Sequence, residues 1–301
     1  LGSHRRRQPF RARGSIMMAR MAHIMNLTRW EWYKLRRRWL PWIMLGVLLV
    51  VSQLFVWVSY SVNRSEQSGD IYANFTLPGS IPNVLGLAHS IGVFLVVILT
   101  ASVLGTEYRW RTIRSILARG TGRWQYLASK IVLLILLAGG ALLIVMAVTA
   151  VSSLIAGALA GDAPAGSSDS TRWIDVPIAF GKAWFSFLPY IALATFFTVL
   201  TTSSAAGMAI SLVYYYAESI VVAICLNLFT WFETVASYLL GRNAAALMRS
   251  GDDTMVINFA IGGGFGSFPS ALHAFLVLTI YILALGGLAI WLFRQRDLTG
   301  S

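Results

Sequence analysis

The apolar positions of this chain gather into six long runs, each about as long as a lipid bilayer is thick. Because an α-helix needs about 20 residues to cross the hydrocarbon core, each run predicts one transmembrane helix. A polar turn at 201–204 separates the fourth run from the fifth and predicts an antiparallel hairpin. The runs cover residues 39–62, 85–105, 131–159, 183–200, 205–231 and 271–293. We therefore expect an all-α integral membrane protein with six transmembrane helices.

Basic and acidic residues are divided unevenly among the segments that join these helices. If both termini are cytoplasmic, the inner segments hold 19 of the 24 lysines and arginines, and the outer loops hold eight of the 12 acidic residues. This positive-inside distribution predicts that the N- and C-termini are cytoplasmic. The inner segments are 1–38, 106–130, 201–204 and 294–301, and the outer loops are 63–84, 160–182 and 232–270.

The composition excludes an ordinary soluble domain. Hydrophobic residues make up 57% of the chain and charged residues 12%, whereas about a quarter of the residues in soluble domains are charged. The net charge of +12 follows the loops and does not indicate a nucleic-acid partner.

The single cysteine, Cys225, lies in a predicted span, so no intrachain disulfide or cysteine-based metal cluster is possible. We expect residues 1–26 to be a tag remnant with a disordered basic stretch, and 27–301 to be one domain.

A short amphipathic helix is predicted over residues 27–38, just before the first span. Thr28 and Glu31 have the spacing of a capping box at a helix start. Aromatic and basic residues alternate after them, a pattern that places the helix in the membrane interface, with aromatic rings toward lipid and cations toward headgroups. The alternative is a simple basic anchor for the first span. The residues assigned to this helix surface are Trp30, Glu31, Lys34 and Arg36.

A second structured element is predicted in the inner loop, over residues 107–123. Ile113 and Ile116 recur at helical spacing among arginines, and the glycines at 120 and 122 end the pattern. A topology signal would need only the arginines, so the apolar positions favour a docking surface for another protein. The candidate docking residues are Glu107, Arg109, Trp110, Thr112, Ile113, Arg114, Ile116, Arg119 and Arg123.

The last outer loop, 232–270, contains an apolar segment that is too short to span the membrane. Residues 255–261 form this segment, and a glycine-rich run follows at 262–266. Backbone at membrane depth must be sheltered by protein or line a cavity. We therefore expect a re-entrant segment before the sixth span.

Several motifs together resemble a known family. The segment 104–114, Leu-Gly-Thr-Glu-Tyr-Arg-Trp-Arg-Thr-Ile-Arg, is similar to the signature after the second span in ATP-binding-cassette (ABC) transporter permeases of the type-2 exporter branch. The following run, 120–130, resembles the family's G-x-x-R-x-x-x-x-x-K pattern, with one residue more between the arginine and the lysine. The Glu31, Lys34 and Leu35 stretch, the turn at 202–207 and the ending at 293–297 also agree. The resemblance covers the chain from about Leu27 and favours small permeases such as those of bacitracin- and lantibiotic-resistance transporters.

The resemblance implies a role for each predicted element. The segment 107–123 would be the coupling helix that docks on an ATP-hydrolysing subunit, and 27–38 would be the connecting helix. Two ATPase subunits and a second permease, identical or related, would complete the transporter in the bacterial cytoplasmic membrane, in contact with membrane lipids. ATP and magnesium would bind to the partner ATPase, and no cofactor is expected on this chain.

The candidates for a translocation path or for a contact between permeases are Glu218, Tyr214, Asn227 and Gln53. A charge near the middle of a bilayer costs about 3 kcal/mol on insertion scales, so Glu218 should face protein or a cavity. The alternative is a structural carboxyl that hydrogen-bonds neighbouring tyrosines such as Tyr214. Gln53 and Asn227 also fit interhelical hydrogen bonding.

Three classes of function remain open. The sequence contains no G-x-x-x-x-G-K-[ST] phosphate loop, no H-E-x-x-H pair and no G-x-S-x-G elbow, so the chain is not expected to be an enzyme by itself. The favoured function is the permease subunit of an ATP-driven exporter for a hydrophobic or amphipathic substrate, such as a peptide antibiotic, drug or lipid. The alternatives are an ATP-independent transporter or channel, and a membrane anchor that recruits a soluble complex.

Overall fold

Six helices of the computed structural model are long and apolar enough to cross a membrane, as the sequence predicts. They are α2 (Trp39–Glu66), α4 (Ser80–Arg109), α6 (Arg123–Ala160), α7 (Asp175–Thr201), α8 (Ser204–Leu228) and α11 (Ala271–Gln295). The structure describes residues 28–66, 72, 74–109, 123–161, 172–229, 231–249 and 268–295, and no strand occurs among them. Three helices begin earlier than the apolar runs predict, α4 by about one turn and α6 and α7 by about two, because helical hydrogen bonding continues into the less apolar flanks.

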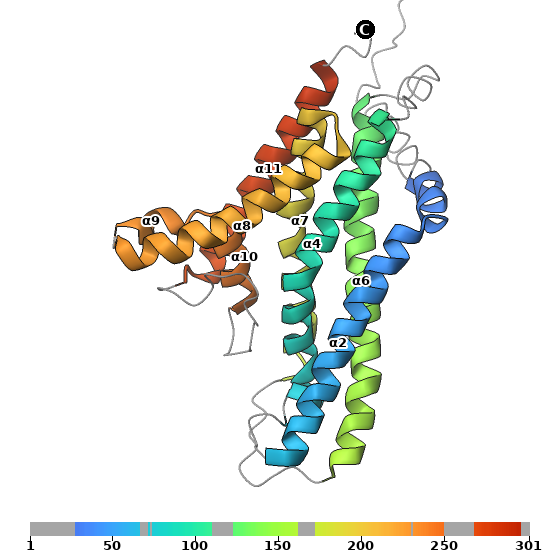
Figure 1. The fold of residues 1–301 in the computed structure, drawn as a ribbon, viewed down its shortest axis with the longest axis vertical. Helices are drawn as coiled ribbons and strands as arrows, with labels where there is room; N and C mark the ends of the chain where they lie inside the picture. The colour runs from blue at the N-terminus through green and yellow to red at the C-terminus, as the bar shows by residue number, and fades with distance from the viewer. Residues whose placement is uncertain are drawn as a thin grey trace, which may run out of the picture.

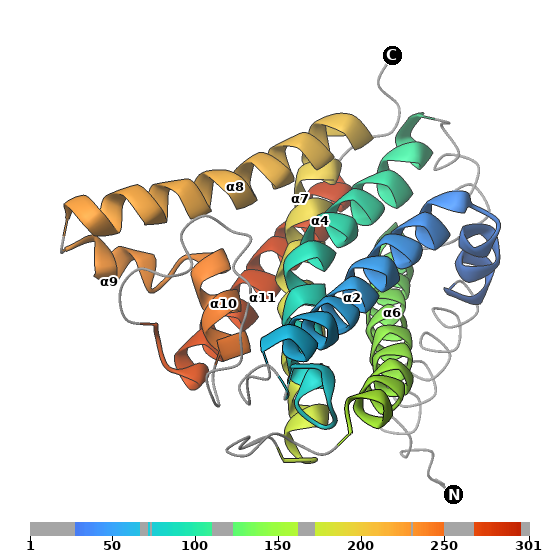
Figure 2. The ribbon, with the colours of Figure 1, turned by 60° about the horizontal axis from the view of Figure 1, so that its bottom comes forward.

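Helices α4 and α7 form the centre of the bundle (Figure 1). Helix α4 packs against α7, α6, α8 and α2, and α7 also packs against α11. The largest fully buried side chains include Leu85 of α4 with Phe187 and Tyr190 of α7. The other spans keep many apolar side chains uncovered by protein, as expected where a helix faces lipid. In Figures 1 and 2, α8 leans away from the bundle, so its far end lies apart from the other spans.

One end of the bundle gathers segments that are far apart in the sequence (Figure 1). The end of α4, the start of α6, the turn between α7 and α8 and the end of α11 all lie there. A short helix over residues 28–36, which corresponds to the helix predicted over 27–38, lies at the same end and leads into α2 through a turn. We call this end of the molecule the junction end.

The predicted hairpin between the fourth and fifth spans is confirmed. Thr202 adopts φ 55°, in the left-handed region, and ends α7. Ser203 caps α8 by accepting a hydrogen bond from the Ala206 backbone N–H at 3.4 Å. A Cβ added at Gly207 would lie 2.6 Å from the Cα of Thr198, so the two helices touch directly after the turn. The glycine permits this close approach.

The segment 232–270, predicted to be an outer loop, contains helices that the sequence analysis did not predict. Helix α9 covers Phe232–Ala236, and α10 covers Leu240–Arg249. Helix α10 packs against α11, α7 and α8, with Leu240 and Asn243 fully buried. The first half of this segment is therefore a packed helical unit, not a loop. The predicted re-entrant segment at 255–266 lies outside the described residues.

Candidate functional site

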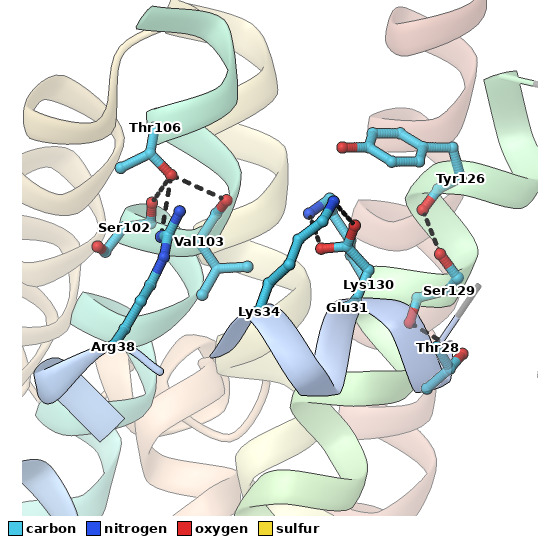
Figure 3. Close-up of polar contacts among 10 residues, drawn as sticks. All are labelled: Thr28, Glu31, Lys34, Arg38, Ser102, Val103, Thr106, Tyr126, Ser129 and Lys130. Atoms are coloured by element: carbon cyan, nitrogen blue, oxygen red, sulfur yellow. Dashed lines mark hydrogen bonds and ion pairs between the residues drawn. The ribbon is translucent and has the colours of Figure 1, made fainter. Parts of the chain in front are cut away.

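A cluster of polar side chains ties the helix at 28–36 to the helices on either side of the predicted coupling loop (Figure 3). The Glu31 carboxylate pairs with Lys130 of α6 at 2.7 Å and with Lys34 at 2.9 Å. Lys130 is 1% exposed, so its ammonium group is enclosed by protein. We call this cluster the polar junction; its members are Thr28, Glu31, Lys34, Arg38, Thr106, Ser129 and Lys130.

Weaker contacts extend the polar junction to α4. The Arg38 guanidinium donates a hydrogen bond to the Thr106 hydroxyl at 3.2 Å, and Thr106 lies in the last turns of α4. The Thr28 hydroxyl donates to the backbone carbonyl of Ser129 at 3.5 Å. The helix at 28–36 and the turn that follows it therefore contact both chain segments that enter and leave the loop between α4 and α6.

The amphipathic pattern of 28–36 explains why Glu31 is inside. Glu31 and Leu35 lie one turn apart on the same helix face, and both are buried. The opposite face carries Trp30 and Tyr33, which are exposed. Lys34 lies three residues after Glu31, a spacing that allows an ion pair within one helix.

The electrostatics of the polar junction keep Glu31 charged. Burial, the largest single influence, raises the pKa of the Glu31 carboxyl, but the charges and hydrogen bonds of Lys130 and Lys34 outweigh it and hold that pKa below its ordinary value. A depressed carboxyl pKa contributes stability above the ordinary pKa, and this contribution is lost as the pH falls through the depressed value. At neutral pH the ion pair with Lys130 is therefore intact.

Sequence reasoning missed the role of Lys130. It placed this lysine in the loop before a third span beginning at 131, whereas α6 begins at Arg123 and carries Lys130 two turns inside the helix. A lysine at the start of a long apolar run needs a carboxylate partner nearby, and this was the available signal. Among the residues predicted for the helix surface, Glu31 is buried, and Trp30, Lys34 and Arg36 are exposed.

The predicted docking residues flank or fill the gap between α4 and α6. Glu107 and Arg109 belong to the last turn of α4, and Arg123 opens α6. These three residues therefore lie at the ends of α4 and α6 that flank the predicted coupling segment. The other docking candidates, between Trp110 and Arg119, lie outside the described residues.

The four intramembrane candidates do not form one site. Glu218 of α8 is buried, and one carboxylate oxygen accepts hydrogen bonds from the backbone N–H groups of Gly241 and Arg242, the latter at 3.2 Å. Tyr214 also hydrogen-bonds this carboxylate, which agrees with the alternative of a structural carboxyl. Asn227 is exposed and donates to a carbonyl of its own helix, and Gln53 of α2 accepts from the hydroxyl of Ser152 on α6.

The main partner of Glu218 is thus the first turn of α10. The N-terminal N–H groups of a helix have no partner within the helix and carry partial positive charge, so a carboxylate there is favourable. This contact holds the otherwise divergent α8 against α10. Sequence reasoning could not find it, because α10 itself was not predicted.

Replacing Glu218 with alanine should lower the stability of the protein by about 1–3 kcal/mol, because two backbone N–H groups of α10 would lose their acceptor. Glutamine keeps a carbonyl oxygen at the same place, so Glu218→Gln should cost less. Thermal unfolding of the purified protein in mild detergent measures both effects. Asn227→Ala, at an exposed position on the same helix, is the control and should change little. Equal melting temperatures for Glu218→Ala and Asn227→Ala would refute the role assigned to this contact.

The six spanning helices, with a short helix tied to one of them by a buried ion pair, define a multi-pass membrane protein. Residues 27–218 match the sequence model of the family described as ABC-2 family transporter protein, and the chain belongs to this family. The match confirms the resemblance drawn from the motifs at 104–114 and 120–130. It includes the whole polar junction and ends at Glu218, before α9 and α10. No curated protein matches the sequence significantly.

Proposed function

We propose that this chain is the membrane-spanning subunit of an ATP-driven exporter and works with separate ATPase subunits. Membership of the ABC-2 transporter family supports a permease. The observation that carries the proposal further is the buried ion pair between Glu31 and Lys130, at 2.7 Å. It ties the helix at 28–36 to α6 directly after the loop that would meet the ATPase. Movement of that loop would therefore reach several spans together.

Coupling would proceed through the two ends of the loop. An ATPase that grips residues 110–122 would move the end of α4 and the start of α6. Two contacts would carry this displacement to the helix at 28–36 and the turn after it. They are the hydrogen bond from Arg38 to Thr106 and the ion pair of Glu31 with Lys130. Because that helix leads into α2, three spans would shift as a unit. The excess of basic residues at the junction end supports a cytoplasmic position for it.

The remaining partners and cargo follow from the same proposal. ATP and magnesium would bind to the ATPase, and this chain would catalyse no reaction of its own. A second permease, identical or related, would complete the path through a bacterial cytoplasmic membrane. The cargo would be hydrophobic or amphipathic, such as a peptide antibiotic, drug or lipid.

Replacing Ile113 with aspartate should abolish binding of a co-expressed ATPase partner, because a charge would enter an apolar contact without a partner. Ile113→Leu keeps an apolar side chain of similar size and should retain binding. Purification through the permease, followed by assay of vanadate-sensitive ATP hydrolysis, measures both. Gel filtration of each variant alone shows whether it folds. A folded Ile113→Asp variant that still retains the ATPase would contradict the docking role, and a wild-type permease that retains no ATPase would favour an anchor or an ATP-independent transporter.

A further inference from the structure

A deep apolar cavity of about 610 Å³ lies beside the polar junction and uses none of its ion-paired groups. The helix at 28–36 closes one end, and α2, α4 and α6 form the walls. Its volume falls within the range of about 300–1,000 Å³ that is typical of ligand pockets. Representative lining residues are Met44, Leu48, Leu99, Leu133, Leu137 and Phe187.

The cavity opens toward the lipid between α2 and α6. In Figures 1 and 2, α2 crosses α6 obliquely. Trp42 of α2 and Leu136 of α6 line the cavity and are 55% and 56% exposed, so protein does not cover them. Phe187 of α7 lines the inner part and is fully buried. The cavity therefore leads from the lipid-facing surface into the centre of the bundle.

Cationic and aromatic side chains surround the end of the cavity at 28–36. Arg29, Trp32 and Arg36 line it there, and all three are exposed. Both ion pairs found within the described residues use the Glu31 carboxylate, so neither of these arginines takes part in one. Arginine binds phosphate oxygens through two parallel hydrogen bonds, and tryptophan prefers the level of lipid headgroups. The end of the cavity thus offers positive charge beside an apolar interior.

We propose that this cavity holds an acyl chain of an anionic phospholipid, with the phosphate bound by Arg29 and Arg36. The apolar walls match the acyl chain, and the two guanidinium groups match the negatively charged phosphate. A zwitterionic lipid would fill the interior, but the cation of its headgroup would offset the charge of its phosphate. The bound lipid would brace α2 and the helix at 28–36 against α6. This site goes beyond the proposed export function and does not depend on it.

Two kinds of variant separate the apolar and the charged parts of the site. A Cβ added at Gly140, which lines the cavity, would meet nothing within 4 Å, so Gly140→Leu can extend its side chain into this space. Gly287→Leu is the matched control, because Gly287 of α11 also faces open space and does not line the cavity. Arg29→Gln combined with Arg36→Gln removes the charge. Arg64→Gln, in the last turn of α2, is its control.

Native mass spectrometry of the purified full chain, without an ATPase, tests the proposal. Dioleoyl phosphatidylglycerol is compared with dioleoyl phosphatidylcholine and with inorganic phosphate. We expect one phosphatidylglycerol to be retained, with affinity about tenfold or more above that of phosphatidylcholine, because the choline cation of phosphatidylcholine would lie close to the two guanidinium groups. Gly140→Leu and the double arginine variant should lose this binding, and both controls should keep it.

Three results would overturn the proposal. Equal retention of the two lipids would show a site without preference for negative charge. Competition by inorganic phosphate at concentrations similar to those of phosphatidylglycerol would identify a phosphate site that ignores the acyl chain. Unchanged binding in Gly140→Leu would place the lipid elsewhere on the protein. Because no ATPase is present, failure here is distinct from failure of the exporter proposal.

Discussion

Replacing Lys130 with methionine should lower the stability of the protein by about 3 kcal/mol, because the Glu31 carboxylate would remain buried without its enclosed partner. Lys34 would still pair with Glu31, at 2.9 Å, so we expect the lower end of the range for a broken buried pair. The side chain of Lys34 is 55% exposed, and its ion pair is therefore screened by solvent. Thermal unfolding of the purified protein in mild detergent measures the loss.

Two further variants distinguish the buried ion pair from other effects of the substitution. Lys34→Met removes only the exposed partner and should cost less than about 1 kcal/mol. Glu31→Gln combined with Lys130→Met leaves no buried charge and should recover most of the stability. Under the export proposal, this double variant would fold but couple ATP hydrolysis to transport poorly. If Lys130→Met melted at the same temperature as Lys34→Met, the buried ion pair of Glu31 with Lys130 would not stabilise the contact between the helix at 28–36 and α6.

Gly105→Ala should also be strongly destabilising, because a Cβ at this position would lie 2.3 Å from the Cα of Ser204. The obstacle is the backbone of α8, which cannot rotate away, so α4 and α8 must separate. The Ser204 hydroxyl donates to the Ala101 carbonyl at 2.9 Å in the same contact and would be lost with it. Overpacking of this kind costs about 1–3 kcal/mol, and we expect the upper end. The melting temperature and the yield of monodisperse protein in detergent report the effect.

Gly287→Ala provides the matched control for this glycine. An added side chain at Gly287 would meet nothing within 4 Å, so only the helix preference changes. Alanine is favoured over glycine in helices by about 1 kcal/mol, and Gly287→Ala should therefore be neutral or slightly stabilising. If Gly105→Ala lowered the melting temperature no more than Gly287→Ala does, α4 and α8 would not pack at Gly105.

The apolar runs predicted the spanning helices well, but they predicted their polar ends less well. The run that begins at 131 belongs to a helix that starts at Arg123. The missing residues mix polar and basic side chains with apolar ones, so hydropathy does not distinguish them from a loop. The consequence was large, because Lys130 changed from a loop residue to a buried member of α6.

Candidate residues were predicted with unequal success, for a related reason. Glu31 and Glu218 were both identified as notable, and both are buried. Their partners were not identified, since Lys130 is 99 positions from Glu31, and Gly241 is 23 positions from Glu218. Helix α10 escaped prediction because residues 240–249 have no long apolar run and their helix is recognised by the face it buries against α7 and α11.

The sequence by itself determined that this is a membrane protein with six spans and a hairpin between the last two spans before α9. These features are local, since each segment in a bilayer must satisfy its own backbone hydrogen bonds, and a helix does so without help from distant residues. Only the tertiary structure decided the pairing of Glu31 with Lys130, the contact of Glu218 with α10, and the cavity beneath Arg29 and Arg36. These depend on the angles and distances at which helices pack, and side chains from many parts of the chain set those together.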